Sequence, residues 1–535
     1  MYIGTELWKD RISVSLIRRK LRDGREIETF PGLTESLYGA VADSAQKYPE
    51  KPAIEDDLGR KLSYRELLAE VDRFAACLKH RFGLKRNDHA ALMVYGCAEF
   101  CIAFLALQKL GVVAVMLPTK YRKPEIRALA EQSDLKCIIC DADFADWFEP
   151  ELKQGVSQII CDPGTEEISF HKLERSEDPI EEAEGLYEDL AVMMFTSGTT
   201  SQSKSVMLTN YNFLHAAGVY SACFHLTEND KTVIPVPTYM ITGLSGLLGT
   251  FLYIGGTVYL YRFFNAERVL SCVKEHEITF MHAAPTVYNL LLSERDKFPE
   301  LPSLRCLACG GSRTPEEKIR QFHDWLPDCT FHTVYGMTET TSPGTILPEA
   351  AYGSRNCLSN GIPVPGLCYK VLDEEGQELP QGEIGELAVS GSNITVGYYK
   401  LDTPLYQNGW LRTGDIGYFN EEGYCYVLDR KKDMINRGGE KVVSMDVENE
   451  LLKIRGVADA AVVGIPDPVY GDTPVALIRK TSESGITEEI IRSELYGRIA
   501  KYKIPSRFLF TDQIPLTPNG KVDKKYIRTL FMEGE

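Results

Sequence analysis

The sequence lacks the features expected of an exported or membrane-spanning protein. Charged residues occur within the first ten positions and no apolar stretch follows them, which argues against a signal peptide. Residues 232–261 carry no charge, but two prolines and five glycines interrupt them. This pattern favours a buried helix followed by a strand over a transmembrane segment. We therefore expect a soluble protein.

The cysteines also show no pattern of a metal centre. There are 14, and Cys137 and Cys140 form a C-x-x-C inside an apolar run that is typical of a buried strand. We expect no zinc site there. Free thiols in this number are typical of a reducing compartment, so the predicted location is cytoplasmic.

Basic residues are outnumbered. The chain has 59 Lys and Arg against 76 Asp and Glu, a net charge of −17, which argues against nucleic acid or an anionic membrane as the main partner. The excess is uneven, because residues 429–535 carry 18 basic and 17 acidic side chains. A near-neutral tail of this kind can approach phosphate groups.

No repeat or low-complexity segment is present, and 535 residues exceed what one hydrophobic core usually supports. Apolar runs alternate with helical patterns in the first part of the chain, which predicts an α/β fold with a buried, mostly parallel sheet. The expected strands are 90–95, 112–117 and 135–140, and the expected helices are 64–82, 98–110 and 124–134.

The character of the chain then changes twice. Short strands between glycine-containing turns at 372–398 predict a small barrel-like subdomain. After residue 428, helices near 447–453 and 488–499 and strands near 460–465 and 474–478 predict a compact α+β domain. The predicted domains are an extension (1–34), to which no role is assigned, a large domain (35–428) and a mobile C-terminal domain (429–535).

Two distant motifs carry chemistry that suits an oligophosphate. Residues 196–204 form a loop rich in Gly, Ser and Thr that ends at Lys204, and such a loop offers backbone N–H groups, hydroxyls and a positive charge. It is a near-miss to the Walker A pattern, with Ser203 in place of glycine, so a P-loop NTPase is one interpretation. Lys521, among turn residues of the tail, reaches the same phosphates only if a terminal domain closes over them.

Three further motifs lie between these two, at 335–339, 412–415 and 429–433. In this order and spacing, the five stretches resemble the adenylate-forming superfamily of acyl-CoA synthetases, stand-alone adenylation enzymes and luciferases. The resemblance spans roughly residues 35–530 and is strongest to the AMP-dependent acyl-CoA synthetase/ligase family. It implies ATP, Mg²⁺ and CoA as reactants or cofactors.

The resemblance assigns most of the nucleotide site to the large domain. It implies that Lys204 acts on the phosphates, that Thr338 binds the α-phosphate and that Glu339 holds Mg²⁺, for which a carboxylate is a suitable ligand. The other residues implied to contact ATP or AMP in that domain are Thr196, Ser197, Gly198, Thr199, Thr200, Gly310, Gly311, Ser312, Tyr335 and Gly336.

The remaining implied roles fall toward the C-terminus. Asp415 and Arg430 would bind the ribose, and Lys432 would be the hinge of a domain rotation between half-reactions. Lys521 would bridge the substrate carboxylate and the α-phosphate and so offset charge in the transition state. After rotation, Gly438 and Gly439 would let the pantetheine arm of CoA pass.

The chain departs from the family pattern in two places. Ser201, Ser203 and Ser205 stand where relatives carry Gly, Pro and Gly. In the expected acyl pocket, Met240 takes the place of a histidine and Tyr239 that of a polar asparagine. The adaptable methionine indicates an apolar acid, either fatty or aromatic.

The predicted function is an AMP-forming ligase that adenylates a carboxylic acid and transfers it to CoA. A stand-alone adenylation enzyme that loads a carrier protein in trans is the nearest alternative, because residues 435–441 resemble that segment of aryl-acid adenylation enzymes. The P-loop NTPase and a non-catalytic nucleotide-binding protein are remote alternatives. They predict ADP release, or ATP binding without acid turnover.

Overall fold

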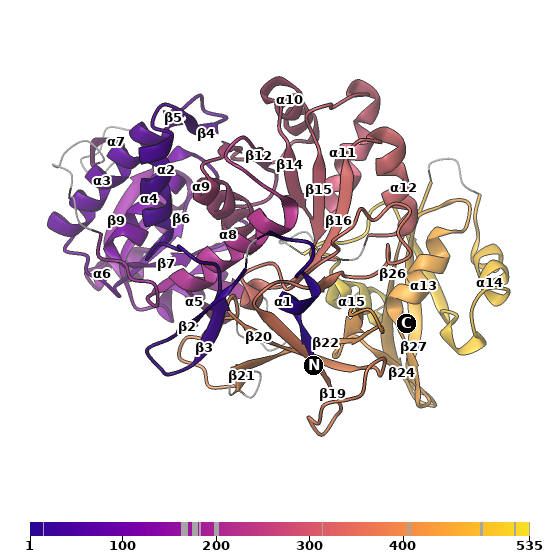
Figure 1. Cartoon of the computed structure of the whole chain (residues 1–535). Helices are drawn as coiled ribbons and strands as arrows, with labels where there is room; N and C mark the ends of the chain where they lie inside the picture. Colours follow the sequence, from indigo (N-terminus) through magenta and orange to yellow (C-terminus); the bar gives the residue numbers. More distant parts are fainter. Residues whose placement is uncertain are drawn as a thin grey trace. The chain divides into compact units, whose positions relative to one another are not determined.

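The computed structural model divides the chain into two compact units (Figure 1). Unit 1 comprises Met1–Tyr369 and Val389–Leu411, and unit 2 comprises Lys370–Ala388 and Arg412–Glu535. The structure describes all residues except 14, 162–169, 174–179, 181–182, 197–202, 313, 404–405, 408, 482–484, 518–520 and 534–535. The predicted domain boundary between residues 428 and 429 stays a prediction.

Unit 1 contains a six-stranded sheet in the order β11-β10-β7-β6-β8-β9. All neighbours are parallel except β10 and β11, which form an antiparallel pair. The strands are β6 (His89–Met93), β7 (Val113–Met116), β8 (Leu135–Asp141), β9 (Ser157–Cys161), β10 (Leu190–Thr196) and β11 (Lys204–Thr209). The predicted parallel, buried sheet is confirmed, and Cys137 and Cys140 lie fully buried in β8.

Capping residues and glycines set the ends of the helices that cover this sheet. Helix α3 (Tyr64–His80) starts at a capping box in which Ser63 and Glu66 bond each other's backbone N–H groups. Helix α4 (Ala98–Leu110) is buried along its whole length and ends at Gly111 in the left-handed region. Helix α5 (Lys123–Glu131) packs on the sheet's apolar face.

A nine-stranded sheet forms the rest of the unit 1 core, in the order β18-β17-β16-β15-β14-β12-β13-β4-β5. Its strands are β4 (Pro52–Asp56), β5 (Lys61–Ser63), β12 (Lys231–Ile234), β13 (Thr257–Leu260), β14 (Phe280–Ala283), β15 (Cys306–Gly310), β16 (Thr330–Tyr335), β17 (Thr345–Ile346) and β18 (Ile362–Pro363). The interior is parallel, and antiparallel pairs close both edges.

Helices accompany this second sheet along its strands (Figure 1). They are α2 (Leu37–Lys47), α8 (Asn210–Phe224), α9 (Thr250–Ile254), α10 (Ala266–His276), α11 (Pro285–Ser293) and α12 (Glu316–Trp325). The uncharged stretch 232–261 holds β12, a π-helical turn, η2 (Thr242–Gly249), then α9 and β13. Among the described residues, no helix is long and apolar enough to cross a membrane.

Cysteines recur at the spacing of Cys137 and Cys140 in the second sheet. Cys306 and Cys309 lie in β15 and are buried as well. Within the described part of the chain, no three or more His, Cys, Asp or Glu residues are grouped so as to hold a metal ion.

The N-terminal extension, to which the sequence assigned no role, is built into unit 1. Strand β1 (Tyr2–Ile3) pairs with β19 (Leu367–Leu372) at Cys368 and Tyr369, and β2 (Ile17–Lys20) and β3 (Glu26–Thr29) form a hairpin. Trp8 is buried and donates from its indole Nε1 to the carbonyl of Pro363 over 2.9 Å. The extension therefore supports the segment that follows β17.

The boundary between the units cuts across three strands, so that unit 2 contains one part of each. Unit 2 also contains all of β23 (Cys425–Arg430). The divided strands are β19, β20 (Gly385–Gly391) and β22 (Trp410–Phe419). Strand β23 pairs with β22 in a register that sets Arg430 opposite Asp415.

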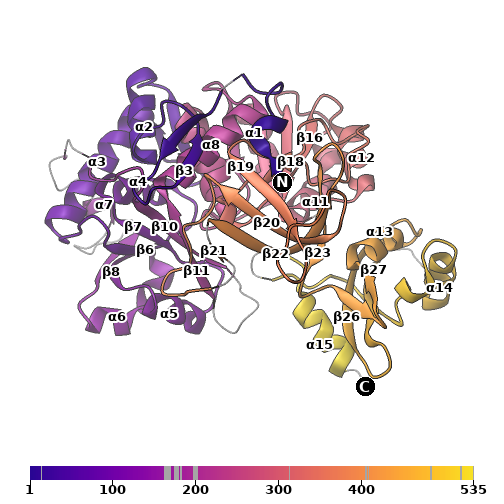
Figure 2. The same ribbon diagram turned by 60° about the horizontal axis from the view of Figure 1, so that its bottom comes forward.

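A five-stranded sheet forms the core of unit 2, in the order β25-β24-β27-β26 with β28 beside β27. Its strands are β24 (Ile435–Arg437), β25 (Glu440–Val442), β26 (Val457–Asp467), β27 (Gly471–Lys480) and β28 (Arg507–Thr511). Helices α13 (Ser444–Leu452) and α14 (Glu488–Tyr496) bury one face and α15 (Lys524–Glu533) the other (Figure 2). The predicted mixed α/β fold class is confirmed.

Candidate active site

Glu339 and Thr338 follow β16 in a short 3-10 turn, η4 (Thr338–Thr340), and both are half-buried. The phenol of Tyr398 donates a hydrogen bond to Glu339 Oε1 over 3.1 Å. Burial raises the pKa of Tyr398, and the Glu339 carboxylate raises it further, so the phenol stays protonated as a donor.

Lys204 approaches the same tyrosine. Its Nζ lies 5.2 Å from the centroid of the Tyr398 ring, and Lys204 pairs with Thr196 at the end of the β10–β11 pair where the predicted phosphate loop connects the two strands. Ser197, Gly198, Thr199 and Thr200 lie outside the described residues. The strand register nonetheless shows that Thr196 and Lys204, at the two ends of the predicted phosphate loop, face each other.

Tyr398 was missed from the sequence. It sits in the uncharged run 393–399, where a tyrosine is typical of core packing. Only the three-dimensional neighbourhood, with Glu339 on one side and Lys204 on the other, marks it as part of the site.

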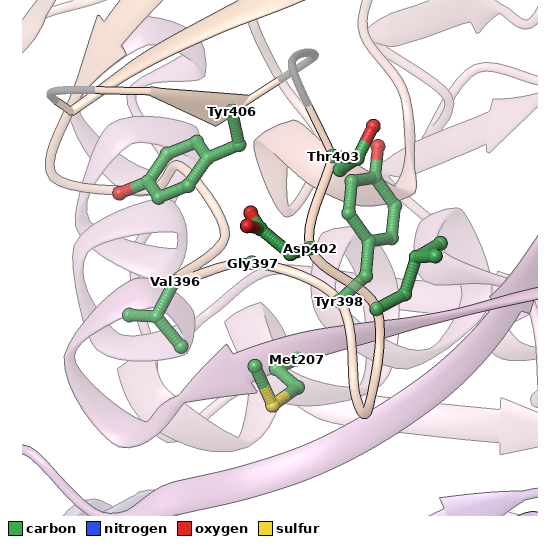
Figure 3. Close-up of a pocket in the computed structure, with 8 residues that line it drawn as sticks. Met207, Val396, Gly397, Tyr398, Asp402, Thr403 and Tyr406 are labelled. Carbon is green, nitrogen blue, oxygen red and sulfur yellow. The ribbon is translucent and has the colours of Figure 1, made fainter.

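A cavity of about 300 Å³ lies beside this group in unit 1. Figure 3 shows Asp402 between Tyr406 and Tyr398, with Met207 of β11 below them. The residues that line the cavity are Met207, Val396, Gly397, Tyr398, Leu401, Asp402, Thr403 and Tyr406. Tyr398 therefore contributes to both the cavity wall and the Glu339 contact.

The glycines of the predicted adenine wall have tight surroundings. Gly310 ends β15, and a Cβ there would come within 2.8 Å of the Val334 carbonyl and 3.1 Å of His282 Nε2. Gly311 adopts a φ of 89°, in the left-handed region that favours glycine. Ser312, next along the chain, is exposed.

The Tyr335–Gly336 pair is equally constrained. Tyr335 ends β16 opposite Thr345 of β17. A Cβ at Gly336 would lie 3.0 Å from the Gly344 backbone nitrogen and 3.1 Å from Thr340 Oγ1. The backbone at this point can therefore carry only a glycine without displacement of its neighbours.

The donor set at Glu339 fits a magnesium ion that arrives with phosphates. Among the described residues, no three His, Cys, Asp or Glu side chains are grouped so as to hold a metal ion. Mg²⁺ usually takes one or two carboxylates and completes its shell with water and substrate phosphate oxygens. A single half-buried carboxylate next to a lysine-bearing hairpin suits that arrangement.

Asp415 and Arg430 meet within unit 2. The register of β22 and β23 sets the two residues opposite each other, and Arg430 Nε lies 3.2 Å from Asp415 Oδ1. The side chain of Asp415 is 5% exposed and that of Arg430 is 44% exposed. A buried carboxylate with an open-faced guanidinium can accept from vicinal hydroxyls, as the predicted ribose role requires.

The predicted hinge segment is fixed on both sides of Lys432, which is itself exposed. Asp429 accepts from Ser444 Oγ at 2.6 Å and from Lys524 Nζ at 3.3 Å. Arg528 donates to Asp433 Oδ1 at 2.8 Å. These bonds hold the segment within unit 2, and the hinge role of Lys432 stays a prediction.

Gly438 and Gly439 form the two-residue turn of the β24–β25 hairpin. Their φ values are 63° and 91°, the combination that favours glycine in a tight hairpin. The turn itself thus explains why both are glycine, and the predicted pantetheine channel stays a prediction.

Lys521 lies in unit 2 shortly before α15 and is exposed. The Thr517 backbone N–H donates to the Lys521 carbonyl at 2.7 Å, and residues 518–520 lie outside the described part of the chain. This bond ties the backbone of Lys521 to Thr517, and the catalytic role of Lys521 stays a prediction.

Tyr239 and Met240, the predicted acyl-pocket pair, lie between β12 and η2. Tyr239 is 7% exposed, and its phenol oxygen has no hydrogen-bond partner among the described residues. Met240 is half-buried and its carbonyl accepts from the Leu244 backbone at 2.9 Å. A buried, unpartnered phenol is costly, and a ligand's polar group would offset that cost.

Comparison with known proteins relates this arrangement to a large family. Residues 41–399 match the model of AMP-binding enzymes, and residues 446–521 match that of the AMP-binding enzyme C-terminal domain. The 2-succinylbenzoate–CoA ligase of Bacillus licheniformis is 34% identical over 89% of this chain and 96% of its own length. The feruloyl-CoA synthase of an Amycolatopsis species is 29% identical over 88% of this chain and 94% of its own.

A solved structure extends the comparison. The o-succinylbenzoate CoA synthetase of Bacillus subtilis, in complex with its acyl-adenylate intermediate, aligns with a TM-score of 0.81 and 30% identity, over 93% of this chain and 99% of that one. The predicted enzyme class, an AMP-forming acid–thiol ligase, is confirmed. The chain belongs to the AMP-binding enzyme family of the adenylate-forming superfamily.

Proposed function

We propose that the chain is an aryl-CoA ligase: it adenylates an aromatic carboxylic acid with ATP, releases pyrophosphate and transfers the acyl group to the thiol of CoA. Relatives over nearly the whole chain are named as ligases of 2-succinylbenzoate and as feruloyl-CoA synthases, which supports an aromatic acid. The fatty-acid branch of the prediction gains no support from them.

The observation that carries the proposal is the meeting of Glu339, Tyr398 and Lys204 at the hairpin that bears the predicted phosphate loop. Lys204 supplies positive charge for the β- and γ-phosphates. Magnesium, when bound at Glu339, would neutralise charge on the phosphate oxygens. The Tyr398 hydrogen bond orients the Glu339 carboxylate that would hold it.

Thr338 and Lys521 complete the first step in this account. The carboxylate of the acid attacks the α-phosphorus, the bond to the pyrophosphate oxygen breaks, and the mixed anhydride of acid and AMP results. Thr338 would donate to an α-phosphate oxygen, and the Lys521 ammonium would offset negative charge on the attacking and phosphoryl oxygens. Asp415 and Arg430 would hold the ribose through both half-reactions.

In the second step, the thiolate of CoA attacks the acyl carbon and AMP leaves. Gly438 and Gly439, which lack side chains, would leave room for the pantetheine arm of CoA to reach the acyl-adenylate. The unpartnered Tyr239 phenol would donate to a polar substituent on the acid, and Met240 would pack against its apolar part. The proposed acid is therefore aromatic with a hydrogen-bond acceptor, rather than a plain alkyl chain.

Product analysis tests this proposal. Purified protein with ATP, Mg²⁺ and CoA is offered substituted benzoic, cinnamic, small dicarboxylic and fatty acids, and CoA thioesters are identified by mass. An aryl-CoA product supports the proposal. Formation of acyl-adenylate without any thioester would instead favour a carrier protein as the acceptor, and turnover of fatty acids alone would overturn the aromatic assignment.

A further inference from the structure

The segment that carries Thr338 and Glu339 has an unusual backbone. Directly after η4, Thr341 and Ser342 adopt φ values of 49° and 35°, in the left-handed region that non-glycine residues rarely occupy. Such residues persist where the surrounding structure over-determines them, often at functional sites. The bonds that hold this segment are therefore informative.

Asn393, two residues after β20, holds the segment from one side. Its Nδ2 donates to the carbonyl of Thr340 at 2.9 Å and to that of Pro343 at 2.7 Å. The hydroxyl of Thr341 donates in return to the Asn393 backbone carbonyl at 2.7 Å. Two acceptor carbonyls on one amide group fix which end of the side chain is the NH₂.

The segment that follows Asn393 bonds to the glutamate itself. The backbone N–H of Thr395 donates to the Glu339 carbonyl at 2.8 Å. Asn393 is fully buried, as are Thr340 and Thr341. These hydrogen bonds therefore lie in the buried interior, where the local dielectric is low and hydrogen bonds are strong.

Tyr220 of α8 holds the segment from the other side. Its phenol lies 3.0 Å from Ser342 Oγ and 3.0 Å from His282 Nδ1. His282 is buried, and burial lowers the pKa of its imidazole to about 3, so it is a neutral partner for the phenol. The left-handed pair is thus fixed between Asn393 and Tyr220.

We propose that Asn393 and Tyr220 are positioning residues for adenylation, which hold Thr338 and Glu339 in the geometry that the α-phosphate and its magnesium ion require. This inference rests on the proposed function, because it assumes that Thr338 and Glu339 act on ATP. Neither residue touches the reacting atoms, and both act through the 337–343 segment.

Ordinary core packing is the competing explanation, and Asn210 offers a matched control. Asn210 is also buried, donates from Nδ2 to a backbone carbonyl, that of Leu186, at 2.8 Å, and has an Oδ1 without a partner among the described residues, as Asn393 does. Among the described residues, Asn210 makes no hydrogen bond to the 337–343 segment. Asn210→Ala thus removes a comparable buried amide elsewhere.

The experiment compares Asn393→Ala, Tyr220→Phe and Asn210→Ala with the unmodified chain. The rate of acyl-adenylate formation and the rate of thioester formation from supplied acyl-adenylate are measured separately. MgATP affinity is measured by calorimetry in the absence of acid, and Tm is measured for each variant. We expect Asn393→Ala and Tyr220→Phe to slow adenylate formation at least about tenfold, since small displacements of positioning groups carry such losses. We also expect both variants to bind MgATP more weakly. The rate of thioester formation from supplied acyl-adenylate should stay within about threefold of that of the unmodified chain.

Each outcome decides the matter. If the unmodified chain forms no adenylate with any acid, the proposed function fails. If the unmodified chain does form adenylate, two results would overturn the positioning role. One is that Asn210→Ala slows adenylation as much as Asn393→Ala does for the same loss of Tm. The other is that Asn393→Ala and Tyr220→Phe slow both half-reactions equally. Should Asn393→Ala not fold, Tyr220→Phe, which deletes one oxygen, decides alone.

Discussion

The Tyr398 phenol donates to the Glu339 carboxylate over 3.1 Å, and the same ring lies 5.2 Å from the Lys204 ammonium. One tyrosine thus joins the predicted magnesium ligand to the end of the predicted phosphate loop. Glu339 and Lys204 are far apart in the sequence. Tyr398 contacts both because β11 and the segment after β20 lie side by side.

Loss of this phenol should weaken the handling of magnesium. Tyr398→Phe keeps the ring beside Lys204 but removes a hydrogen bond to a charged group, about 1.5–3 kcal/mol. We expect a roughly tenfold slower adenylation or a similar rise in the Mg²⁺ concentration for half-maximal rate. Tyr399→Phe is the control, since Tyr399 donates to Asp134 at the surface. Equal effects of both changes would refute the role of Tyr398.

Removal of the Lys521 ammonium should separate the half-reactions. Lys521→Ala is expected to reduce adenylate formation by about 10²-fold or more, a typical loss for a transition-state charge contact, while thioester formation from supplied acyl-adenylate persists. Lys525→Ala, at another exposed lysine of the same region, should change neither step. Rapid-quench measurement of each half-reaction checks this, and a parallel decline of both steps would contradict a two-conformation mechanism.

Asp415 should matter in both steps. Asp415→Asn removes the charge that faces Arg430 at 3.2 Å, and we expect weaker binding of ATP and of AMP by roughly tenfold. Glu386→Gln provides the comparison, because Glu386 is a similarly buried carboxylate that pairs with Arg412 and Lys431 in unit 2. Nucleotide affinity by titration calorimetry should fall for Asp415→Asn only, and unchanged affinity would remove Asp415 from the ribose site.

Acid should destabilise unit 1 through two buried histidines. Burial lowers the pKa of His215 to about 4 and that of His282 to about 3, from an ordinary 6.5. Below pH 6.5 the unfolded chain binds these protons and the folded chain does not, so stability is complete above pH 6.5 and is lost as pH falls toward 4. Each histidine contributes about 1.4 kcal/mol per pH unit in that window.

The measurement is Tm between pH 7.5 and 4.5 for the unmodified chain and for His215→Asn. The variant should start with a lower Tm, because His215 Nε2 bonds the Pro365 carbonyl at 2.9 Å. Its further decline on acidification should be shallower, because the imidazole of His215 no longer titrates. Parallel curves would show that His215 does not contribute to the pH dependence.

The fold class and the family followed from the sequence because both depend on local patterns. Alternating apolar runs specify the parallel strands, and the capping box at Ser63 places the start of α3 to the residue. The 98–110 helix prediction coincides with α4 because Cys97 is extended and Gly111 is left-handed.

The supporting residues could not be predicted in the same way. Tyr398, Asn393 and Tyr220 act through contacts that join segments far apart in the chain, and each residue alone has the sequence context of core packing. The N-terminal extension was likewise invisible to motif reasoning, because its contacts to Pro363 and Gly366 span more than 350 residues. Tertiary proximity, which a single sequence does not encode locally, carries this part of the site.

Acid-dependent release of pyrophosphate decides whether the chain is the proposed aryl-CoA ligase. The chain is incubated with ATP and Mg²⁺ and a panel of aromatic, small dicarboxylic and fatty acids, with and without CoA. The account predicts release that requires an aromatic acid, rises with CoA and is accompanied by AMP. Release of ADP and phosphate, or no acid-dependent release at all, would contradict it.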